Sequence, residues 1–529
     1  MLAQNMQVEV HNYFTPATDA FGCLVDSLNT QSSYLLTSSE LEKLIKEQTD
    51  KLARELLQAK LNMIGMLEVE TIVKGSDGVA RPRRKLLERT IGTIFGDVTF
   101  ERWGYSAEKG TSLFPADGHL NLPPEKYSHE LRRLVSEDVT RSSYDETLEV
   151  LSRRTAATVP KRQGLELVNR AAKDFVGFYD AQVNIPENQC VTGKDSSSLL
   201  ILTTDGKGVV MRHEGLREAT KKAAKKEQHK LKKRLTAGEK KDRKRMAQVA
   251  SVYTIAPHIR TAEEISGSAP VDAEKKKKAP RPEDKRVWAS LEREPDEVIK
   301  EMFKEAQMRD PRNEKQWVAL VDGNKIQLQL LKEQAMAFGV SLTIIIDFIH
   351  VLEYLWKASH VFYKKGDPLC EKFVTERLLL VLHGQSSQVA EGIIKMATDL
   401  DLPKEERKSA DTCASYLSKY EEYLIYDKYL AQGLPIATGV IEGACRYLVK
   451  DRMDITGARW GLSGAEAVLR LRSLCASDDF DEYWSYHVKR ERERNHSVKY
   501  ENGQIPPLKV HYANAVSPKS KPQLRLVKR

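Results

Sequence analysis

The chain has 529 residues, of which 41% are hydrophobic and 30% are charged, and its formal net charge is +9. This length predicts two to four domains with ordinary cores, and no run of about 18 apolar residues suggests a membrane span. The six cysteines form no Cys-x-x-Cys pair, which argues against a zinc site and favours a reducing compartment. No Gly-x-x-x-x-Gly-Lys-Ser/Thr loop indicates use of a nucleoside triphosphate. The first residues lack the pattern of a signal peptide, so we expect a cytoplasmic protein.

The N-terminal third is expected to begin with a helical region, residues 1–84. Within it, residues 1–38 are polar with little pattern and are expected to be loosely ordered, whereas apolar residues recur at helical spacing after Ser39, which is a candidate N-cap. The region 85–127 follows. Two β-rich runs flank Gly96-Asp97 there, which predicts a β-hairpin.

Residues 128–190 are expected to contain a helix-turn-helix. One amphipathic helix is predicted from Tyr144 to Arg153, and Pro160 suits the first position of a second helix. Basic residues at the start of that second helix, Lys161 and Arg162, are candidates for DNA contacts. Two consecutive helices are also common as plain packing units.

Three apolar runs in the region 191–350 each lead into an aspartate. They are the runs that precede Asp205, Asp322 and Asp347, with His350 three residues after the last. Short apolar runs bounded by Gly or Asp predict buried strands. Three strands of this kind would bring three carboxylates to one edge of a sheet, although Asp-Gly pairs are also common in plain turns.

A basic segment interrupts this strand-rich region. Residues 217–246 contain fourteen Lys or Arg against four Asp or Glu, which is typical of a segment that meets a polyanion. The strongest DNA-binding candidates are Lys240, Lys241, Arg243, Lys244 and Arg245. A second insert, residues 258–312, is expected to be a flexible linker that ends in a helix near Asp296–Gln307.

Residues 351–435 show helical apolar spacing throughout and predict an all-α block. The region 436–475 then places Glu442 in the first turn of a helix, with Arg446 four residues on and expected on the same face. Residues 476–529 are expected to form a helix and a basic tail.

Two aspartates and one glutamate at these positions suit a two-metal site. Asp205, Asp322 and Glu442 would hold two divalent cations through oxygen ligands, as Mg²⁺ prefers, and would support in-line attack on a phosphodiester. Asp347 is the rival for the second acid, because it also ends a strand. His350 and Arg446 are accessory candidates, and Trp288, Trp356 and Trp460 are candidates for stacking on a flipped base.

Four stretches resemble a known family: Thr204-Asp-Gly-Lys-Gly, Val321-Asp-Gly-Asn, Asp347-Phe-Ile-His-Val-Leu-Glu-Tyr-Leu-Trp and Gly439-Val-Ile-Glu-Gly-Ala-Cys-Arg. They are similar to DDE transposases of bacterial insertion sequences, in the Mutator-like superfamily and closest to the ISKra group. The resemblance implies an α/β fold, with an RNase H-like core interrupted by an all-α insertion. It also implies Asp205, Asp322 and Glu442 as the metal-binding triad, with Asp347 and His350 as an accessory Asp-x-x-His signature.

The function implied by the resemblance is transposition. Such a protein binds transposon ends and target DNA as a dimer or larger assembly, and cleaves and transfers strands with two Mg²⁺ ions or with Mn²⁺. It works in the bacterial cytoplasm, at the nucleoid. Two other classes remain open: a domesticated DNA-binding protein that no longer cuts, and a scaffold protein with basic linkers.

Overall fold

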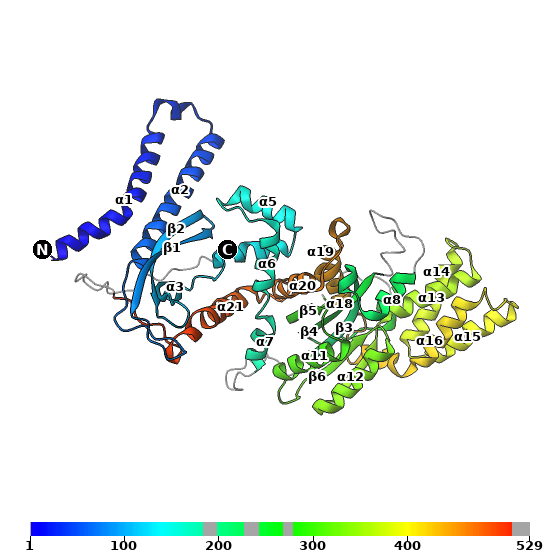
Figure 1. Ribbon diagram of the computed structural model, residues 1–529. Coiled ribbons are helices and arrows are strands. Elements are labelled where there is room, and N and C mark those ends of the chain that lie inside the picture. Colours follow the sequence, from blue (N-terminus) through cyan, green and yellow to red (C-terminus); the bar gives the residue numbers. More distant parts are fainter. Residues whose placement is uncertain (1, 184–197, 227–242, 268–278, 510–529) are drawn as a thin grey trace. The chain divides into compact units, whose positions relative to one another are not determined.

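A computed structural model describes residues 2–183, 198–226, 243–267 and 279–509, and the chain divides into two compact units (Figure 1). The first unit comprises Met1–Asp138, Tyr144–Leu167 and Trp484–Arg529, and the second comprises Val139–Ser143 and Val168–Tyr483. Among the described residues no helix is long and apolar enough to cross a membrane.

The first unit begins with a helical hairpin. Helices α1 (Leu2–Leu28) and α2 (Ser38–Gly65) lie side by side and are joined by a short 3₁₀ turn, η1 (Gln31–Leu35) (Figure 1). The expectation of loose order in residues 1–38 is therefore wrong. The N-cap of α2 is Thr37 rather than Ser39, because the Thr37 hydroxyl accepts from the Glu40 amide while the Glu40 side chain accepts from the Thr37 amide.

The predicted β-hairpin is confirmed. Strands β1 (Arg83–Thr93) and β2 (Gly96–Ser106) pair antiparallel, with Thr93 opposite Gly96. The two-residue connection therefore lies one step before the Gly96-Asp97 pair. Gly96 follows it with a φ of 101°, a conformation that glycine adopts without strain. Alternate residues of the hairpin enter a buried core that consists of Leu61, Ile91, Val98, Phe100 and Leu122.

Short helices follow the hairpin. They are α3 (Pro115–His119), α4 (His129–Val139), α5 (Tyr144–Arg154), α6 (Lys161–Ala171) and α7 (Phe175–Val183). Helices α5 and α6 match the predicted pair of helices. They approach closely at Gly164, where an added Cβ would lie 3.3 Å from Leu148.

The second unit is built on a five-stranded mixed sheet. Its strands are β3 (Leu199–Val210), β4 (Lys244–Ile255), β5 (Glu283–Ser290), β6 (Gln316–Val321) and β7 (Leu342–Ile346), in the order β5-β4-β3-β6-β7. Strand β4 pairs antiparallel with β3 and β5, whereas β6 pairs parallel with β3 and β7. The first six residues of the central strand β3 are all buried, which explains its uninterrupted apolar run.

Three expectations about this sheet are wrong. Asp205 lies inside β3 rather than at its end, because β3 continues to Val210 along β4. Strand β4 starts at Lys244, so it already includes the end of the basic segment 217–246 that was expected to interrupt the strands. The insert 258–312 contains the edge strand β5 besides the expected helix.

Helices cover the sheet and extend beyond it. Those between the strands are α8 (Glu218–Lys226), α10 (Ala262–Ser266), α11 (Pro295–Arg309) and α12 (Lys325–Phe338). The predicted all-α block is confirmed, and its helices α13 to α16 gather beside the sheet (Figure 1). The block consists of α13 (Phe348–Phe362), α14 (Pro368–Leu382), α15 (Ser386–Asp399), α16 (Lys408–Lys419) and α17 (Tyr426–Ala431). The last helices are α18 (Gly439–Ala444), the π-helix η5 (Cys445–Lys450), α19 (Asp451–Met453), α20 (Leu462–Ala476) and α21 (Phe480–Asn495).

A buried ion cluster joins β5 to α11. The Arg286 guanidinium lies 2.5 Å from a Glu305 oxygen and 2.8 Å from a Glu301 oxygen, and only 5% of the arginine is exposed. It also lies over the rings of Tyr179 and Trp288, at 3.5 and 4.4 Å from their centroids. Two carboxylates and two aromatic rings therefore replace the water that this cation loses.

Candidate metal centre

Three aspartates lie at the same step of the sheet, two of them directly after β6 and β7 and the third inside β3. Asp205, Asp322 and Asp347 each lie two residues beyond a residue that the parallel ladder aligns: Thr203, Leu320 and Ile345. The pairing of β3 with β6 ends at Thr203, so Asp205 has lost its β6 neighbour although it still pairs with β4. The carboxyl ends of β6 and β7 thus meet the middle of β3, and neighbouring strands lie roughly 5 Å apart.

The Asp347 carboxylate is fixed by hydrogen bonds from neighbouring residues. Asp347 is fully buried, and its carboxylate accepts from the Thr438 hydroxyl at 2.5 Å, the Ile349 amide at 3.0 Å, the Thr438 amide at 3.3 Å and His350 Nδ1 at 3.4 Å. Thr438 is the residue before α18, so these bonds tie the end of β7 to the start of the helix that carries Glu442.

Glu442 lies close to Asp347 and His350. Ligand atoms of Asp347, His350 and Glu442 all lie within 4.8 Å of one another, an arrangement able to hold a metal ion. Neither oxygen of the exposed Glu442 accepts a hydrogen bond from the described residues. Its limited burial, followed by the charges of Asp347 and, more weakly, Asp205, raises the pKa of the Glu442 carboxyl. The hydrogen bond to Asp347 raises the pKa of His350, and the charge of Asp322 adds to it.

Asp205 accepts hydrogen bonds through both carboxylate oxygens, and Asp322 accepts one through a single oxygen. Asp205 Oδ1 accepts from the Gly206 amide at 2.6 Å, and Oδ2 accepts from the Cys445 thiol at 3.3 Å. Asp322 Oδ1 accepts from the Asn324 amide at 3.0 Å, and its other oxygen accepts from none of the described residues.

Sequence reasoning missed Cys445 and Thr438 as members of this centre. Burial, followed by the charge of Asp205, raises the pKa of the Cys445 thiol, which keeps it a donor to that carboxylate. Cys445 is also the first residue of the π-helix η5, a form often found at functional sites. Their closeness to Glu442 in the sequence could have pointed to both residues: Thr438 directly precedes the stretch Gly439–Arg446, and Cys445 lies within it.

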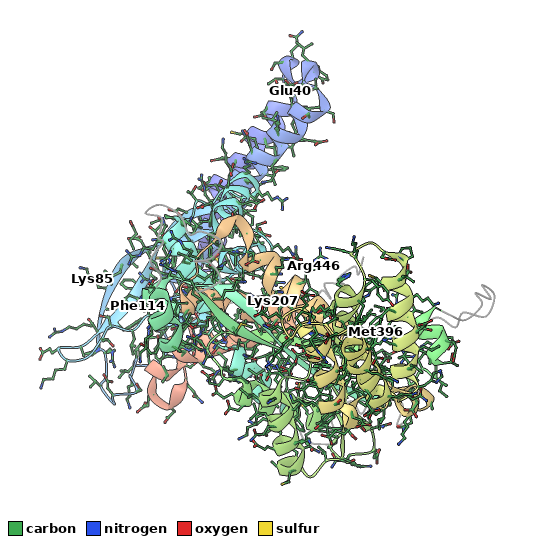
Figure 2. The ribbon with its side chains drawn as sticks, turned by 90° about the vertical axis from the view of Figure 1, so that its right-hand side faces the viewer. Glu40, Lys85, Phe114, Lys207, Met396 and Arg446 are labelled. Atoms are coloured by element: carbon green, nitrogen blue, oxygen red, sulfur yellow. The ribbon has the colours of Figure 1, made fainter. Side chains whose placement is uncertain are left out.

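Arg446, expected on the same helix face as Glu442, makes no hydrogen bond or ion pair with it in the part of the chain that the structure describes. The Arg446 side chain is 80% exposed, and in the described part of the chain its ion pair is with Asp451, at 3.9 Å. Arg446 lies in the π-helix η5, on exposed surface. Figure 2 labels Arg446 on η5 and Lys207 on β3, two elements that pack against each other.

The DNA-binding candidates differ in accessibility. Lys161 and Arg162 are exposed and pair with the exposed carboxylates of Asp145 and Glu166, contacts that a phosphate can replace at little cost. Lys244 is exposed at the start of β4, and Arg243 before it is half-buried. The Arg245 guanidinium instead donates to backbone carbonyl groups of Leu291 and Gly215, so its role is structural. Lys240, Lys241 and the tail beyond Lys509 lie outside the described residues.

Residues 32–222 match the model of an uncharacterised protein family (UPF0236). The matched segment ends after β3, so it contains Asp205 but not Asp322 or Glu442. No curated protein matches the chain.

Proposed function

We propose that the chain is a DDE-type transposase, which binds transposon ends and carries out metal-dependent DNA strand cleavage and strand transfer. The observation that carries this proposal is the meeting of four acids from distant parts of the chain. Asp205, Asp322 and Asp347 lie at one step of the sheet, where β6 and β7 end beside the middle of β3, and Glu442 from α18 lies against Asp347.

The topology supports an RNase H-like core. Three antiparallel strands followed by two parallel ones, in the order β5-β4-β3-β6-β7, form the arrangement expected of that fold. The helical block from α13 to α17 stands between the last strand and the helix of Glu442. The resemblance implies an insertion at this same point.

Hydrogen bonding supports Asp205, Asp322 and Glu442 as the metal ligands. Asp322 and Glu442 retain carboxylate oxygens without a hydrogen-bond donor among the described residues, and the second oxygen of Asp205 faces only a thiol. Asp347 already accepts four hydrogen bonds, which suits a positioning residue better than a ligand. This favours Asp322 over its rival as the second acid.

The residues fit a hard divalent cation. Mg²⁺ prefers oxygen ligands, and a cation would offset the charges of Asp347 and Asp205, which add to burial in raising the pKa of Glu442. Bound Mg²⁺ would supply a nucleophile activated at neutral pH and stabilise the leaving oxygen. In this chain Asp347 and Thr438 hold the start of α18 against the sheet, and Cys445 orients Asp205, so the ligands are set before DNA arrives.

Strand joining tests the proposed function directly. The purified chain is incubated with a duplex that carries the DNA flanking its gene and with a supercoiled target plasmid, in Mg²⁺, Mn²⁺ or EDTA. We expect covalent joining of duplex ends to the plasmid in either metal and none in EDTA. Binding of the flanking duplex without joining in any metal would leave a DNA-binding protein that does not cut.

Salt dependence tests the basic segment. Replacing Lys240, Lys241, Arg243 and Lys244 by Gln is expected to flatten the plot of log affinity for duplex DNA against log salt by about 3 to 4, because each phosphate contact contributes roughly 0.9 to the slope. Arg245 is left intact, since its bonds hold backbone. Lys395→Gln/Lys404→Gln, at exposed positions on α15 and in the turn that follows it, serves as the control. An unchanged slope in the fourfold variant would identify the segment as solvated surface.

A further inference from the structure

A cleft of about 590 Å³ opens directly beside Asp322. Its walls are α13, α16 and the turn after β6, and the residues that bear on its chemistry are Asp322, His350, Tyr354, Lys357, Tyr416 and Lys419. Ligand pockets in proteins typically have volumes of roughly 300–1,000 Å³. This volume therefore suits a small part of a DNA strand and not a duplex.

Aromatic rings hold the two walls together. Tyr354 of α13 and Tyr416 of α16 stack with centroids 4.1 Å apart and planes 24° apart. The Tyr416 hydroxyl donates to the Asp322 backbone carbonyl at 3.2 Å, and the Tyr420 hydroxyl donates to the Gly323 carbonyl at 2.6 Å. The stacked pair is thus fixed to the turn that carries Asp322, while Tyr354 and Tyr416 remain only partly buried.

Each wall also supplies a cation. Lys357 Nζ lies 5.2 Å from the centroid of the Tyr354 ring, and Lys419 Nζ lies 3.9 Å from that of Tyr420. The Lys357 side chain is 59% exposed, and its contact with Glu353, at 3.3 Å, is one that solvent weakens. Aromatic surface for a base and ammonium groups for phosphates therefore occur together, next to a carboxylate of the candidate metal centre.

We propose that this cleft binds one or two unpaired nucleotides of the DNA strand that continues from the phosphodiester at the metal centre. A base contacts Tyr354, and flanking phosphates contact Lys357 and Lys419. The inference rests on the proposed function and adds the form of DNA that the site takes. Trp288 and Trp460, considered for base stacking from the sequence, are 2% and 7% exposed and cannot take this role.

The test measures binding without catalysis. Fluorescence anisotropy in EDTA follows fluorescein-labelled dT10 and a labelled ten-base-pair duplex, each with the full-length chain. Tyr354→Ala is expected to weaken dT10 binding at least about fivefold, the lower range for loss of one stacked base, with less than a twofold effect on the duplex. Tyr354→Phe keeps the ring and is expected to bind dT10 like wild type. Tyr34→Ala, at an 81% exposed position on η1, is the control.

The lysines provide an independent measurement. Lys357→Gln/Lys419→Gln is expected to flatten the salt plot for dT10 by about 1.4, since each single-strand phosphate contact contributes roughly 0.7. Wild-type affinity and slope in both variants would overturn the proposal. So would an equal loss of duplex and dT10 binding in Tyr354→Ala, or competition by dTMP as strong as that by unlabelled dT10, which would identify a site for free nucleotides.

The two proposals fail separately. If wild type joins strands but Tyr354→Ala binds dT10 as tightly as wild type does, only the proposal for the cleft is wrong. If the chain joins no strands in Mg²⁺ or Mn²⁺ but dT10 binding depends on Tyr354, the transposase proposal is wrong. The cleft is then a binding site for single-stranded DNA.

Discussion

Replacing Asp205, Asp322 or Glu442 by its amide is expected to slow strand joining at least about 10³-fold, because the bound cations supply several kcal/mol of transition-state stabilisation. An amide keeps the size of the side chain but loses the negative charge that holds a divalent cation. Affinity for duplex DNA is expected to stay within about twofold, since Lys and Arg supply most phosphate contacts. Joining rates and duplex affinity are measured on the same preparations.

The variant Asp347→Asn distinguishes a residue that positions the metal ligands from the ligands themselves. Its four accepted hydrogen bonds make it a positioning residue, so we expect the Mg²⁺ concentration for half-maximal joining to rise about 10- to 100-fold. Raised Mg²⁺ should then recover much of the rate, unlike in the three ligand variants. Asp399→Asn, at the exposed end of α15, is the matched control. If Asp347→Asn abolished strand joining at every Mg²⁺ concentration while Asp322→Asn stayed active, Asp347 would be the metal ligand and Asp322 the positioning residue.

Arg286→Met is expected to lower the free energy of opening of β5 and α11 by about 3 kcal/mol, because it removes the buried cation that Glu301 and Glu305 share and leaves each with one partner, Arg293 and Arg309. A chain of two units need not unfold in one step, so local hydrogen exchange of β5 and α11 peptides is the appropriate measurement. Arg153→Met breaks an exposed pair with Glu149 and is expected to cost less than about 1 kcal/mol.

Two further measurements test whether charge is the cause. Adding Glu301→Gln and Glu305→Gln to Arg286→Met is expected to restore part of the loss, since it removes the buried negative charge, and the cations left without a carboxylate, Arg293 and Arg309, are partly exposed. In wild type the charges of Arg286 and Arg309 outweigh burial and lower the pKa of Glu305. The stability from this carboxylate is therefore complete above about pH 4.5, its ordinary value, and is lost as the pH falls through the lowered pKa. A loss in Arg286→Met that persists in the triple variant would indicate lost packing instead.

Local patterns were good predictors of the elements but weaker at their limits. The apolar runs before Asp322 and Asp347 became strands, and the helical spacing of 351–435 became a helical block. The two glycines that follow Asp205 suggested a turn, yet β3 runs through them because β4 offers a partner along its whole length. Strand β5 was missed because its first four residues are charged, as suits an edge strand. One of them, Arg286, is buried, which its sequence neighbours do not reveal.

The sequence by itself determined the candidate residues: carboxylates at the ends of apolar runs, a glutamate in a first helical turn, and lysine-rich segments. Those signals are local, because burial and periodicity act over a few neighbouring residues. Only the tertiary structure decided what each residue contacts. Thr438 binds Asp347 from 91 positions away, and Cys445 binds Asp205 from 240. Such partners are set by how the sheet edge and α18 pack, and that packing is invisible to a pattern read along a single chain.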